Sequence, residues 1–572
     1  MRQIGKVALN VTNRSGFDKS HRNLFTGKCG TLYPILTEEV LPNSTIHLKE
    51  AISAKMPPLA SDTFMNVQLK TEAFFVPFRL LYHGFENWLM ETPLRSGNGI
   101  TYKLKCPVLN VDQAAVGTLS DYLGWKCNGT IGSIDENINI FPFLAYHRIY
   151  DDWYRNSRIQ APLFTAAGNY PHSEGTSDFL SYSVANLPFV DIADNTIAGG
   201  GLIPSQLNVF DGTRTVSAGS TAPSGYFADG SYITDLRQRN FGLDYFTSAQ
   251  PSAQMGNARS VQVMLNGSMD TVLNEDSETI NVMKTPDGVA LAGSFTISSL
   301  RAQNSLQQFC ERNNFSFRAS DYYYINYGSR LRSGLAQRAI FLGQHTLDVY
   351  TKTVVQNNNT DSTGSFNNPF YSVGAQYGNA YAQGSNTLVG EFTADEPGIL
   401  MVMASLVPKV TYNTGMRRYF KHFVNEGSQT DLANAILQNV GNQPIWKSEL
   451  TGDPLDAGAV FGFTDRYAEW MDHPDEIHGL LKDGQSLQSF ALQRSFSNGM
   501  DPINGSFLEI PQTYLDQVLA VSTGVSGMSY WAEVYFDFKV VQPLNEYSIP
   551  SLQDPAYEHG HKIVINKNGG SL

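Results

Sequence analysis

Cysteine is scarce in this sequence and shows no regular spacing. The chain has four cysteines in 572 residues, namely Cys29, Cys106, Cys127 and Cys310, and none of them forms a C-x-x-C pair. Zinc knuckles and disulfide scaffolds both depend on regularly spaced cysteines, so neither is indicated. We expect reduced thiols in a protein made inside the cell.

Long apolar runs are also missing. The longest lies near residues 398–407, well short of the roughly 18 residues that a membrane-spanning helix needs. The first residues contain no apolar stretch typical of a signal peptide. We therefore expect no membrane insertion and no secretion.

Charge is sparse and unevenly distributed. Charged residues make up 16% of the chain and hydrophobic residues 42%, with a net charge of −13. A weakly charged surface suits a chain that packs against copies of itself, although a large polar β-protein would have the same composition. The net charge lacks the basic footprint of a dedicated nucleic-acid binder. Between residues 161 and 296, thirteen acidic side chains outnumber five basic ones.

The N-terminal segment has the opposite charge. Residues 1–28 show no helical or strand periodicity, which predicts an extended arm ordered only by a partner. The arm could neutralise nucleic-acid phosphates, which needs only charge and reach, or it could lie over a neighbouring subunit. Both alternatives stay open. The segment contains one acidic residue, Asp18, and six basic residues, which are Arg2, Lys6, Arg14, Lys19, Arg22 and Lys28.

Alternating apolar and polar residues predict strands at 64–75, 347–355 and 531–540. The continuous apolar run at 399–407 is typical of a strand buried on both faces. Strands near both ends of a long chain imply pairing between remote segments, which a closed sandwich achieves economically. Three- and four-residue spacing predicts helices at 142–156, 299–312 and 430–440. The expected fold class is therefore all-β with helical insertions.

Two polar segments interrupt this pattern. Residues 356–387 are close to low complexity and predict a surface loop. Residues 161–296 are too long for a plain loop and predict a variable surface insertion. The resulting organisation is a basic arm (1–28), the first part of a core (29–160), the insertion (161–296), the rest of the core (297–555) and a C-terminal tail (556–572).

A search for catalytic signatures finds no G-x-S-x-G, no H-E-x-x-H and no phosphate-binding or dinucleotide-binding glycine loop. We expect neither an enzyme nor a cofactor. The strongest metal-like cluster holds Asp472, His473, Asp475, Glu476 and His478. A solvated acidic loop is the favoured interpretation, because nothing in the sequence fixes the two imidazoles on one face. The same holds for His559 and His561.

Several ordered segments resemble the major capsid proteins of the microvirus family, which are small tailless icosahedral single-stranded DNA bacteriophages, in a gokushovirus-like or related subgroup. In the C-terminal half, RAIFLG, VPKVTYNTGMRRYF, VFGFTDRYAEW and LNEYSIPSL are similar to family segments in the same order. The resemblance covers residues 16–160 and 297–552 and leaves out the insertion. In the N-terminal half it is carried by Phe17, Asp18, Ser20, His21, Glu39, Val40, Leu41, Pro42, Phe74 to Pro77, Arg79, Leu80, Trp88, Pro142, Phe143, Ala145, Tyr146, Ile149, Tyr150, Trp153 and Arg155.

This resemblance implies a viral jelly-roll β-sandwich with long inserted loops. It also implies an icosahedral shell of about sixty copies that encloses a circular single-stranded DNA genome. The implied partners are further copies of the chain, the genome, an internal scaffolding protein, a DNA pilot protein, a small basic DNA-packaging protein and a host surface receptor. The implied location is the virion, assembled in the bacterial host cytoplasm, with the insertion exposed for host attachment.

Two other classes of protein remain as alternatives. A secreted carbohydrate-binding or adhesin β-sandwich would fit the aromatic and polar content, but it would need a signal peptide. A β-sandwich glycosidase would need two facing carboxylates about five to nine ångströms apart, which the 53 acidic residues do not exclude.

Overall fold

A computed structural model describes most of the chain. The described residues are 14–81, 85–90, 94–95, 101–104, 108–110, 114–125, 130–131, 137–160, 163, 190–191, 209–210, 234–254, 268–273, 279–284, 297–313, 319–329, 338–355, 376–422, 441–456 and 458–544.

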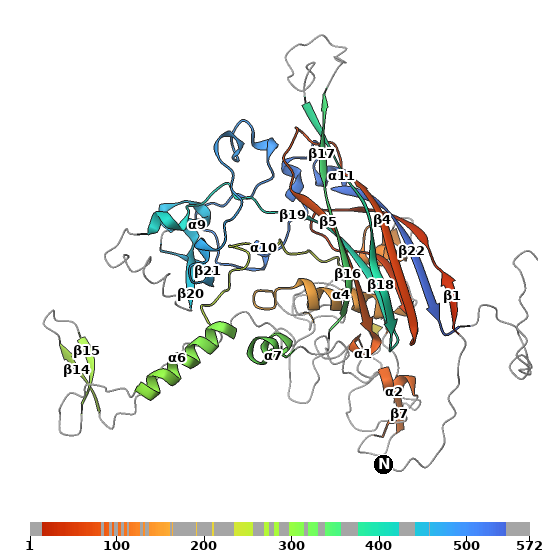
Figure 1. The fold of residues 1–572 in the computed structure, drawn as a ribbon, viewed down its shortest axis with the longest axis horizontal. Coiled ribbons are helices and arrows are strands. Elements are labelled where there is room, and N and C mark those ends of the chain that lie inside the picture. Colours follow the sequence, from red (N-terminus) through yellow and green to blue (C-terminus); the bar gives the residue numbers. More distant parts are fainter. Residues whose placement is uncertain are drawn as a thin grey trace, which may run out of the picture.

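Two antiparallel sheets form the centre of the molecule (Figure 1). A six-stranded sheet has the order β1-β22-β4-β18-β17, and β2 also pairs with β22. A four-stranded sheet has the order β16-β5-β19-β3. The strands of the first are β1 (Ser15–Asp18), β2 (His21–Gly27), β22 (Tyr530–Gln542), β4 (Ser44–Lys55), β18 (Gln376–Ala394) and β17 (Tyr350–Val355). Those of the second are β16 (Ile340–Asp348), β5 (Val67–Pro77), β19 (Gly398–Pro408) and β3 (Tyr33–Val40).

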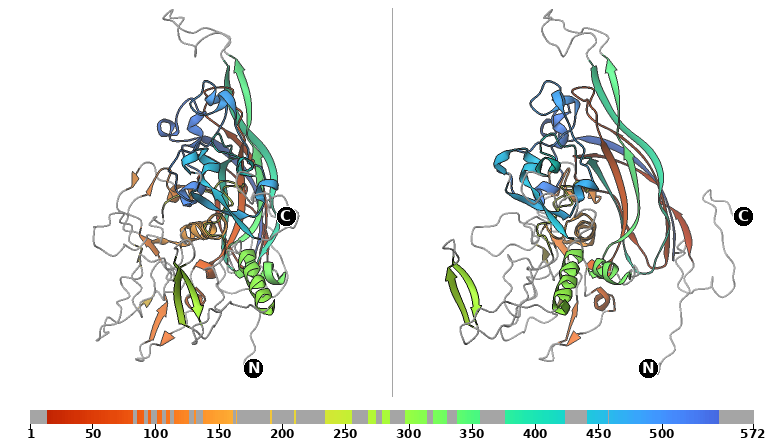
Figure 2. Two further views of the ribbon diagram at one scale, coloured as in Figure 1. Left: turned by 90° about the vertical axis from the view of Figure 1, so that its left-hand side faces the viewer. Right: turned by 60° about the vertical axis from the view of Figure 1, so that its left-hand side comes forward.

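The strand order is that of a jelly roll. In one sheet the strand near the C-terminus, β22, pairs with β2 on one side and β4 on the other, and β18 follows β4. In the other sheet β3, β19, β5 and β16 are neighbours in that order. The chain thus crosses repeatedly between two sheets that face each other, as in viral double-sheet sandwiches. The further views in Figure 2 show the long strands of both sheets running alongside one another.

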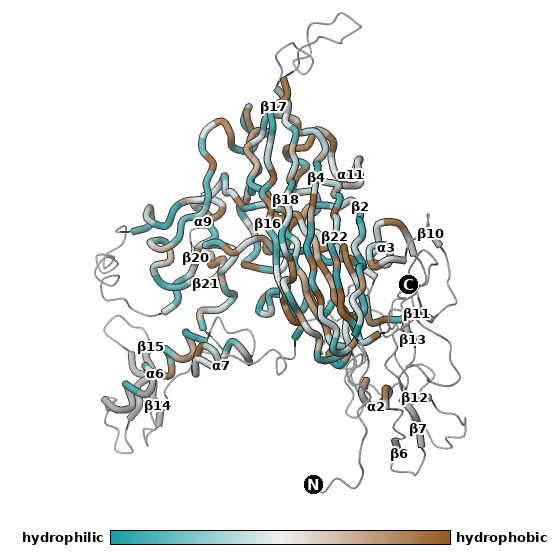
Figure 3. The backbone as a smooth tube through the Cα atoms, turned by 45° about the vertical axis from the view of Figure 1, so that its right-hand side comes forward, coloured by the Kyte–Doolittle hydropathy of each residue, from teal (hydrophilic) through white to brown (hydrophobic). Residues whose placement is uncertain are grey.

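Side-chain periodicity explains the sandwich. Along β22, Ala532, Val534, Phe536 and Phe538 are buried while the residues between them face solvent. Figure 3 shows the same alternation of apolar and polar residues along β22 and β4. One face of the six-stranded sheet therefore packs into the core and the other stays open to water.

β19 is buried along its whole length because both of its faces are covered. Leu400, Val402 and Leu406 pack in the core between the sheets. Ile399 and Met401 belong to a second apolar cluster under helix α4. The sequence prediction of a strand buried on both faces at 399–407 is confirmed.

Helix α4 (Phe141–Ile149) continues into a π-helical turn, η1 (Tyr150–Tyr154). Pro142 lies in the first turn, where a missing N–H is tolerated. The Asn139 side chain accepts a hydrogen bond from the Phe141 N–H at 3.0 Å and so satisfies one unpaired donor at this end. The helix lies against β5 and β19.

A smaller lobe packs beside the sandwich and shares its core through Ile445, Leu450 and Phe461. It contains β20 (Asn442–Trp446), α9 (Lys447–Thr451), η7 (Pro454–Asp456), β21 (Val460–Asp465), η8 (Ala468–Trp470), η9 (Gly479–Leu481), η10 (Gln488–Phe490) and α10 (Gly505–Leu508). The other elements are α1 (Phe78–Leu81), α2 (Phe85–Leu89), β6 (Leu94–Arg95), β7 (Thr101–Leu104), β8 (Val108–Asn110), β9 (Ala114–Ala115), α3 (Leu119–Tyr122), β10 (Thr130–Ile131), β11 (Asn137–Asn139), β12 (Val190–Asp191), β13 (Val209–Phe210), β14 (Ser268–Leu273), β15 (Thr279–Lys284), α6 (Ile297–Arg312), α7 (Ala319–Tyr327), η6 (Arg418–Lys421), η11 (Tyr514–Gln517) and α11 (Thr523–Ser526).

Most of the strand and helix predictions are confirmed. The fold class is all-β with helical insertions, and β5, β22, α4 and α6 lie where the sequence predicts a strand or a helix. The strand predicted at 347–355 is confirmed except at Val349, where the chain passes from β16 in one sheet to β17 in the other. The predicted helix at 430–440 and the tail at 556–572 lie outside the described residues.

Two segments expected to lack regular structure contain strands. Residues 15–27, predicted as part of a free arm, form β1 and β2 at the edge of the six-stranded sheet. Residues 376–387, predicted as part of a surface loop, belong to β18. Both segments carry polar residues because one face of this sheet is open to water, and this polarity resembles that of an irregular loop.

Candidate assembly and nucleic-acid surfaces

The basic side chains of the N-terminal segment are spread along the sheet edge. Lys19 Nζ pairs with a Glu38 carboxylate oxygen at 2.7 Å, and Arg22 Nε pairs with Glu533 at 2.5 Å. Arg14 donates a hydrogen bond to the Thr45 hydroxyl at 2.7 Å. Three of the six predicted phosphate-binding residues thus have partners within the subunit.

The remaining three basic residues differ in their placement. Lys28 lies just after β2, where its backbone N–H donates to the Tyr33 hydroxyl at 2.9 Å. Arg2 and Lys6 lie outside the described residues. The six residues are therefore not gathered at one point, and DNA contact by this segment stays a prediction.

The predicted insertion at 161–296 contains a stretch of core. Phe241, Tyr245, Phe246 and Ala249 are buried in the main apolar cluster. The backbone of residues 234–254 is hydrogen-bonded to remote segments, for example from the Phe241 N–H to the Leu508 carbonyl at 2.8 Å. The prediction that all of 161–296 is a surface insertion is therefore wrong for 234–254.

A buried ion pair fixes this stretch to the sheet. Arg239 Nη1 lies 2.5 Å from one Glu72 carboxylate oxygen, and Nη2 lies 3.1 Å from the other. Tyr154 donates a hydrogen bond to the same carboxylate at 2.5 Å. Burial is the largest single influence and would lower the pKa of Arg239, but Glu72 and Tyr154 together outweigh it and the pKa is raised. Burial first, and then Glu72, raise the pKa of Tyr154.

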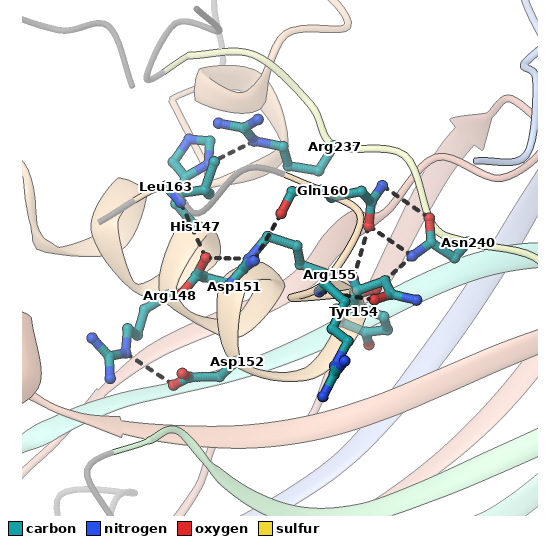
Figure 4. A network of polar contacts seen from close by, with 12 residues as sticks. His147, Arg148, Asp151, Asp152, Tyr154, Arg155, Gln160, Leu163, Arg237 and Asn240 are labelled. Atoms are coloured by element: carbon teal, nitrogen blue, oxygen red, sulfur yellow. Dashed lines mark hydrogen bonds and ion pairs between the residues drawn. The ribbon is translucent and has the colours of Figure 1, made fainter. Parts of the chain in front are cut away.

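The contacts around η1 hold the start of the predicted insertion next to its core stretch at 234–254 (Figure 4). Asp151 pairs with Arg155 at 2.6 Å and accepts a hydrogen bond from the Leu163 N–H at 3.1 Å. Gln160 donates to the Asn240 side-chain oxygen at 3.1 Å. Residues 160 and 240 are thus direct neighbours, although 80 positions separate them.

The acidic loop lines a cavity of about 620 Å³ together with aromatic residues such as Tyr419 and Trp470. Glu476 is held by Arg417, with Nη2 2.5 Å from Oε2. This hydrogen-bonded guanidinium lowers the pKa of the Glu476 carboxyl. Asp475 instead pairs with Lys409 at 2.8 Å. In the part of the chain that the structure describes, no three His, Cys, Asp or Glu side chains converge as a metal site would require.

The buried Glu72–Arg239 pair could not be found from the sequence. Alternation in β5 placed Glu72 on a polar face, whereas its side chain is buried beside η1. No local signal in the sequence links the two residues. The buried thiols of Cys29 and Cys310 are free, while Cys106, Cys127, His559 and His561 lie outside the described residues.

The described helices include none that is both long and apolar enough to cross a lipid bilayer.

A jelly roll with one exposed sheet face is typical of structural β-sandwich subunits, and this chain has both features. The chain belongs to the phage capsid family described as "Capsid protein (F protein)", whose family model matches residues 5–552. It is therefore a structural capsid protein of the virion that assembles into a shell, and the resemblance to microvirus capsid proteins is confirmed.

Two relatives match over nearly the whole chain. "Capsid protein VP1" of Chlamydia phage 1 is 25% identical over 604 residues, covering 96% of this chain and 98% of the relative. "Capsid protein VP1" of Bdellovibrio phage phiMH2K is 22% identical over 565 residues, covering 94% and 96%. The secreted adhesin alternative finds no support in these matches.

Proposed function

We propose that about sixty copies of this chain close into an icosahedral shell around a circular single-stranded DNA genome. The observation that carries the proposal is the hairpin of β17 and β18, which extends beyond the sandwich (Figure 1). All six residues of β17 are exposed, and its last two residues are the apolar Val354 and Val355. An exposed apolar strand of this kind is stabilised by packing on another subunit.

The partners follow from the capsid family and its resemblance to microviruses. We expect an internal scaffolding protein, a DNA pilot protein and a small basic DNA-packaging protein during assembly in the bacterial host cytoplasm. A structural role without enzymatic activity fits this setting.

The host receptor is proposed to meet the acidic insertion. The segments that qualify are 164–233 and 255–296, because residues 234–254 form part of the core. Their polar and acidic composition is compatible with a surface that faces solvent.

The shell proposal is tested by expressing the full chain with its scaffolding partner and imaging the product by electron microscopy. Uniform closed particles are expected. When the cells also supply the circular genome and its packaging proteins, the particles should contain nuclease-protected single-stranded DNA. Monomers alone in the first case, or particles without DNA in the second, would contradict the proposal.

A charge placed on the hairpin tests the contact between subunits. Val354→Lys and Val355→Lys together should abolish particles while leaving the urea midpoint of the monomer unchanged, because both side chains are already exposed. Val354→Thr keeps the β-branched shape and is the matched control, which should still assemble. Normal particles from the lysine variant would show that the hairpin makes no such contact.

A further inference from the structure

We infer that the open sheet face is a stacking platform for single-stranded DNA. The open sheet face consists of the outward-pointing side chains of β2, β22, β4 and β18. This inference rests on the proposed function, because it assigns the enclosed genome to one surface of the subunit.

Aromatic rings stand on this face beside cations. Trp531 is 38% exposed and Tyr535 is 50% exposed, and both alternate with buried core residues of β22. They lie four residue steps apart along the strand, which is about 13 Å. Arg22 of β2 lies directly opposite Tyr535 in the strand register. Single-strand-binding proteins combine these two features, stacked aromatic rings and nearby positive charge.

A row of side chains in register crosses the sheet from Trp531. Lys55 of β4 pairs in register with Trp531 on one side and with Tyr381 of β18 on the other. Tyr381 in turn pairs with Tyr350 of β17, and their ring centroids are 6.3 Å apart. Two rings thus flank one cation on neighbouring strands about 4.8 Å apart, and the Tyr350 ring follows on the next strand.

The charges of the face favour a polyanion. The two carboxylates of β22 on this face are already paired: Glu533 with Arg22 at 2.5 Å and Asp537 with Lys539 at 3.4 Å. The exposed Glu391 of β18 is a third carboxylate, so that the four cations Arg22, Lys49, Lys55 and Lys539 outnumber the acidic side chains by one. Lys49 and Lys55 are exposed, and the ion pairs found among the described residues include neither of them. This local excess of positive charge stands out in a chain with a net charge of −13.

A second copy of the chain fits this face less well. The cores of protein–protein interfaces are depleted in lysine, whereas β4 and β22 present Lys49, Lys55 and Lys539 here. The N-terminal segment enters the fold at this sheet, because β1 pairs with β22. The thirteen residues before Arg14 contain Arg2 and Lys6 and no acidic residue.

Binding of a fluorescent 20-nucleotide oligodeoxythymidylate to the purified full chain tests the inference. Fluorescence anisotropy should show that Trp531→Ala and Tyr535→Ala each weaken binding by about 5- to 150-fold, the loss of one stacked base. The double variant Lys49→Gln, Lys55→Gln should reduce the slope of log affinity against log salt by about 0.7 for each phosphate that is no longer neutralised.

Matched controls lie in the smaller lobe. Trp470→Ala removes a ring that is 49% exposed, and Lys482→Gln removes a cation away from the open sheet face. Both should bind the oligonucleotide like the unmodified chain. Trp531→Phe keeps an aromatic ring and should retain most of the affinity.

Three results would overturn the inference. The first is wild-type affinity in the Trp531, Tyr535 and lysine variants. The second is no binding by the unmodified chain at low salt. The third is loss of particles in Trp531→Ala with unchanged oligonucleotide binding, which would make the face a contact between copies. Particles that protect DNA while these variants bind normally would overturn this inference alone, whereas unmodified particles without DNA would overturn the proposed function.

Discussion

At the scale of single residues, the contact between Glu72 and Arg239 decides how a remote segment joins the sandwich. The two residues lie 167 positions apart, and their side chains meet at 2.5 Å beside the buried ring of Tyr154. A charge pair of this kind costs desolvation energy, so its net contribution to stability is small. Removing one partner destabilises the fold strongly, because the other charge stays buried without compensation.

Arg239→Met should therefore lower the free energy of unfolding by about 3–5 kcal/mol. The matched control is Arg22→Met, whose partner Glu533 is on the surface, where a pair is worth at most about 1 kcal/mol. Urea unfolding of the unassembled chain, followed by circular dichroism, measures both. Equal losses in the two variants would show that the buried pair has no special role.

The burial of Glu72 and its pairing with Arg239 could not be predicted from the sequence. The alternation in β22 could be read directly because each side chain's burial depends on its own position in the strand. Glu72 follows the same alternation in β5 but is buried, because α4 and η1 cover the second face of that sheet. Tertiary packing decides which helix covers which strand, and the local pattern of apolar and polar residues does not encode this choice.

At the scale of elements, the edge strands β1 and β2 separate the N-terminal residues into two parts. Residues before Arg14 lie outside the described structure, while residues 15–27 pair with β22 along most of its length. Phe25 of β2 is buried in the core between the sheets. Removing these strands would expose a long row of unpaired backbone groups on β22, which favours edge-to-edge aggregation.

Two truncations test this division. A chain beginning at Arg14 should keep the urea midpoint of the full chain and stay monodisperse in size-exclusion chromatography. A chain beginning at Cys29 should unfold at a lower urea concentration and aggregate. If both truncations behave alike, β1 and β2 contribute nothing to the edge of the sheet.

The elements recovered from sequence are those with a strong internal pattern. β19 was predicted correctly because a continuous apolar run has few alternatives. The first half of β18 was missed because it pairs across an open sheet, where Gln383, Ser385 and Thr387 face water. Hydrogen bonds to β4 and β17 hold such a strand, and its β4 partners lie more than 300 residues away.

At the scale of the whole molecule, the two ends of the segment 161–239 lie next to each other. Gln160 and Asn240 are in direct contact, so the segment between them leaves and re-enters the core at neighbouring points. Such a segment can be shortened without separating the halves of the fold, since loop closure costs little once both ends are already held. Residues 234–254 do not belong to it, because they contribute Phe241, Tyr245 and Phe246 to the core.

Two deletions of different length follow from this geometry. Replacing residues 166–232 with a Gly/Ser linker of about ten residues, roughly 17 Å in mean reach, should leave particles that assemble but no longer attach to host cells. Deleting the whole of 161–296 should yield aggregated protein, because it removes three large buried aromatic side chains, each worth about 3–5 kcal/mol. Electron microscopy and a cell-attachment assay measure the first outcome, and solubility the second. Normal attachment by the shorter deletion would remove residues 166–232 from the receptor-binding surface, whereas soluble particles from the longer one would show that the packing of 234–254 is dispensable for the capsid fold.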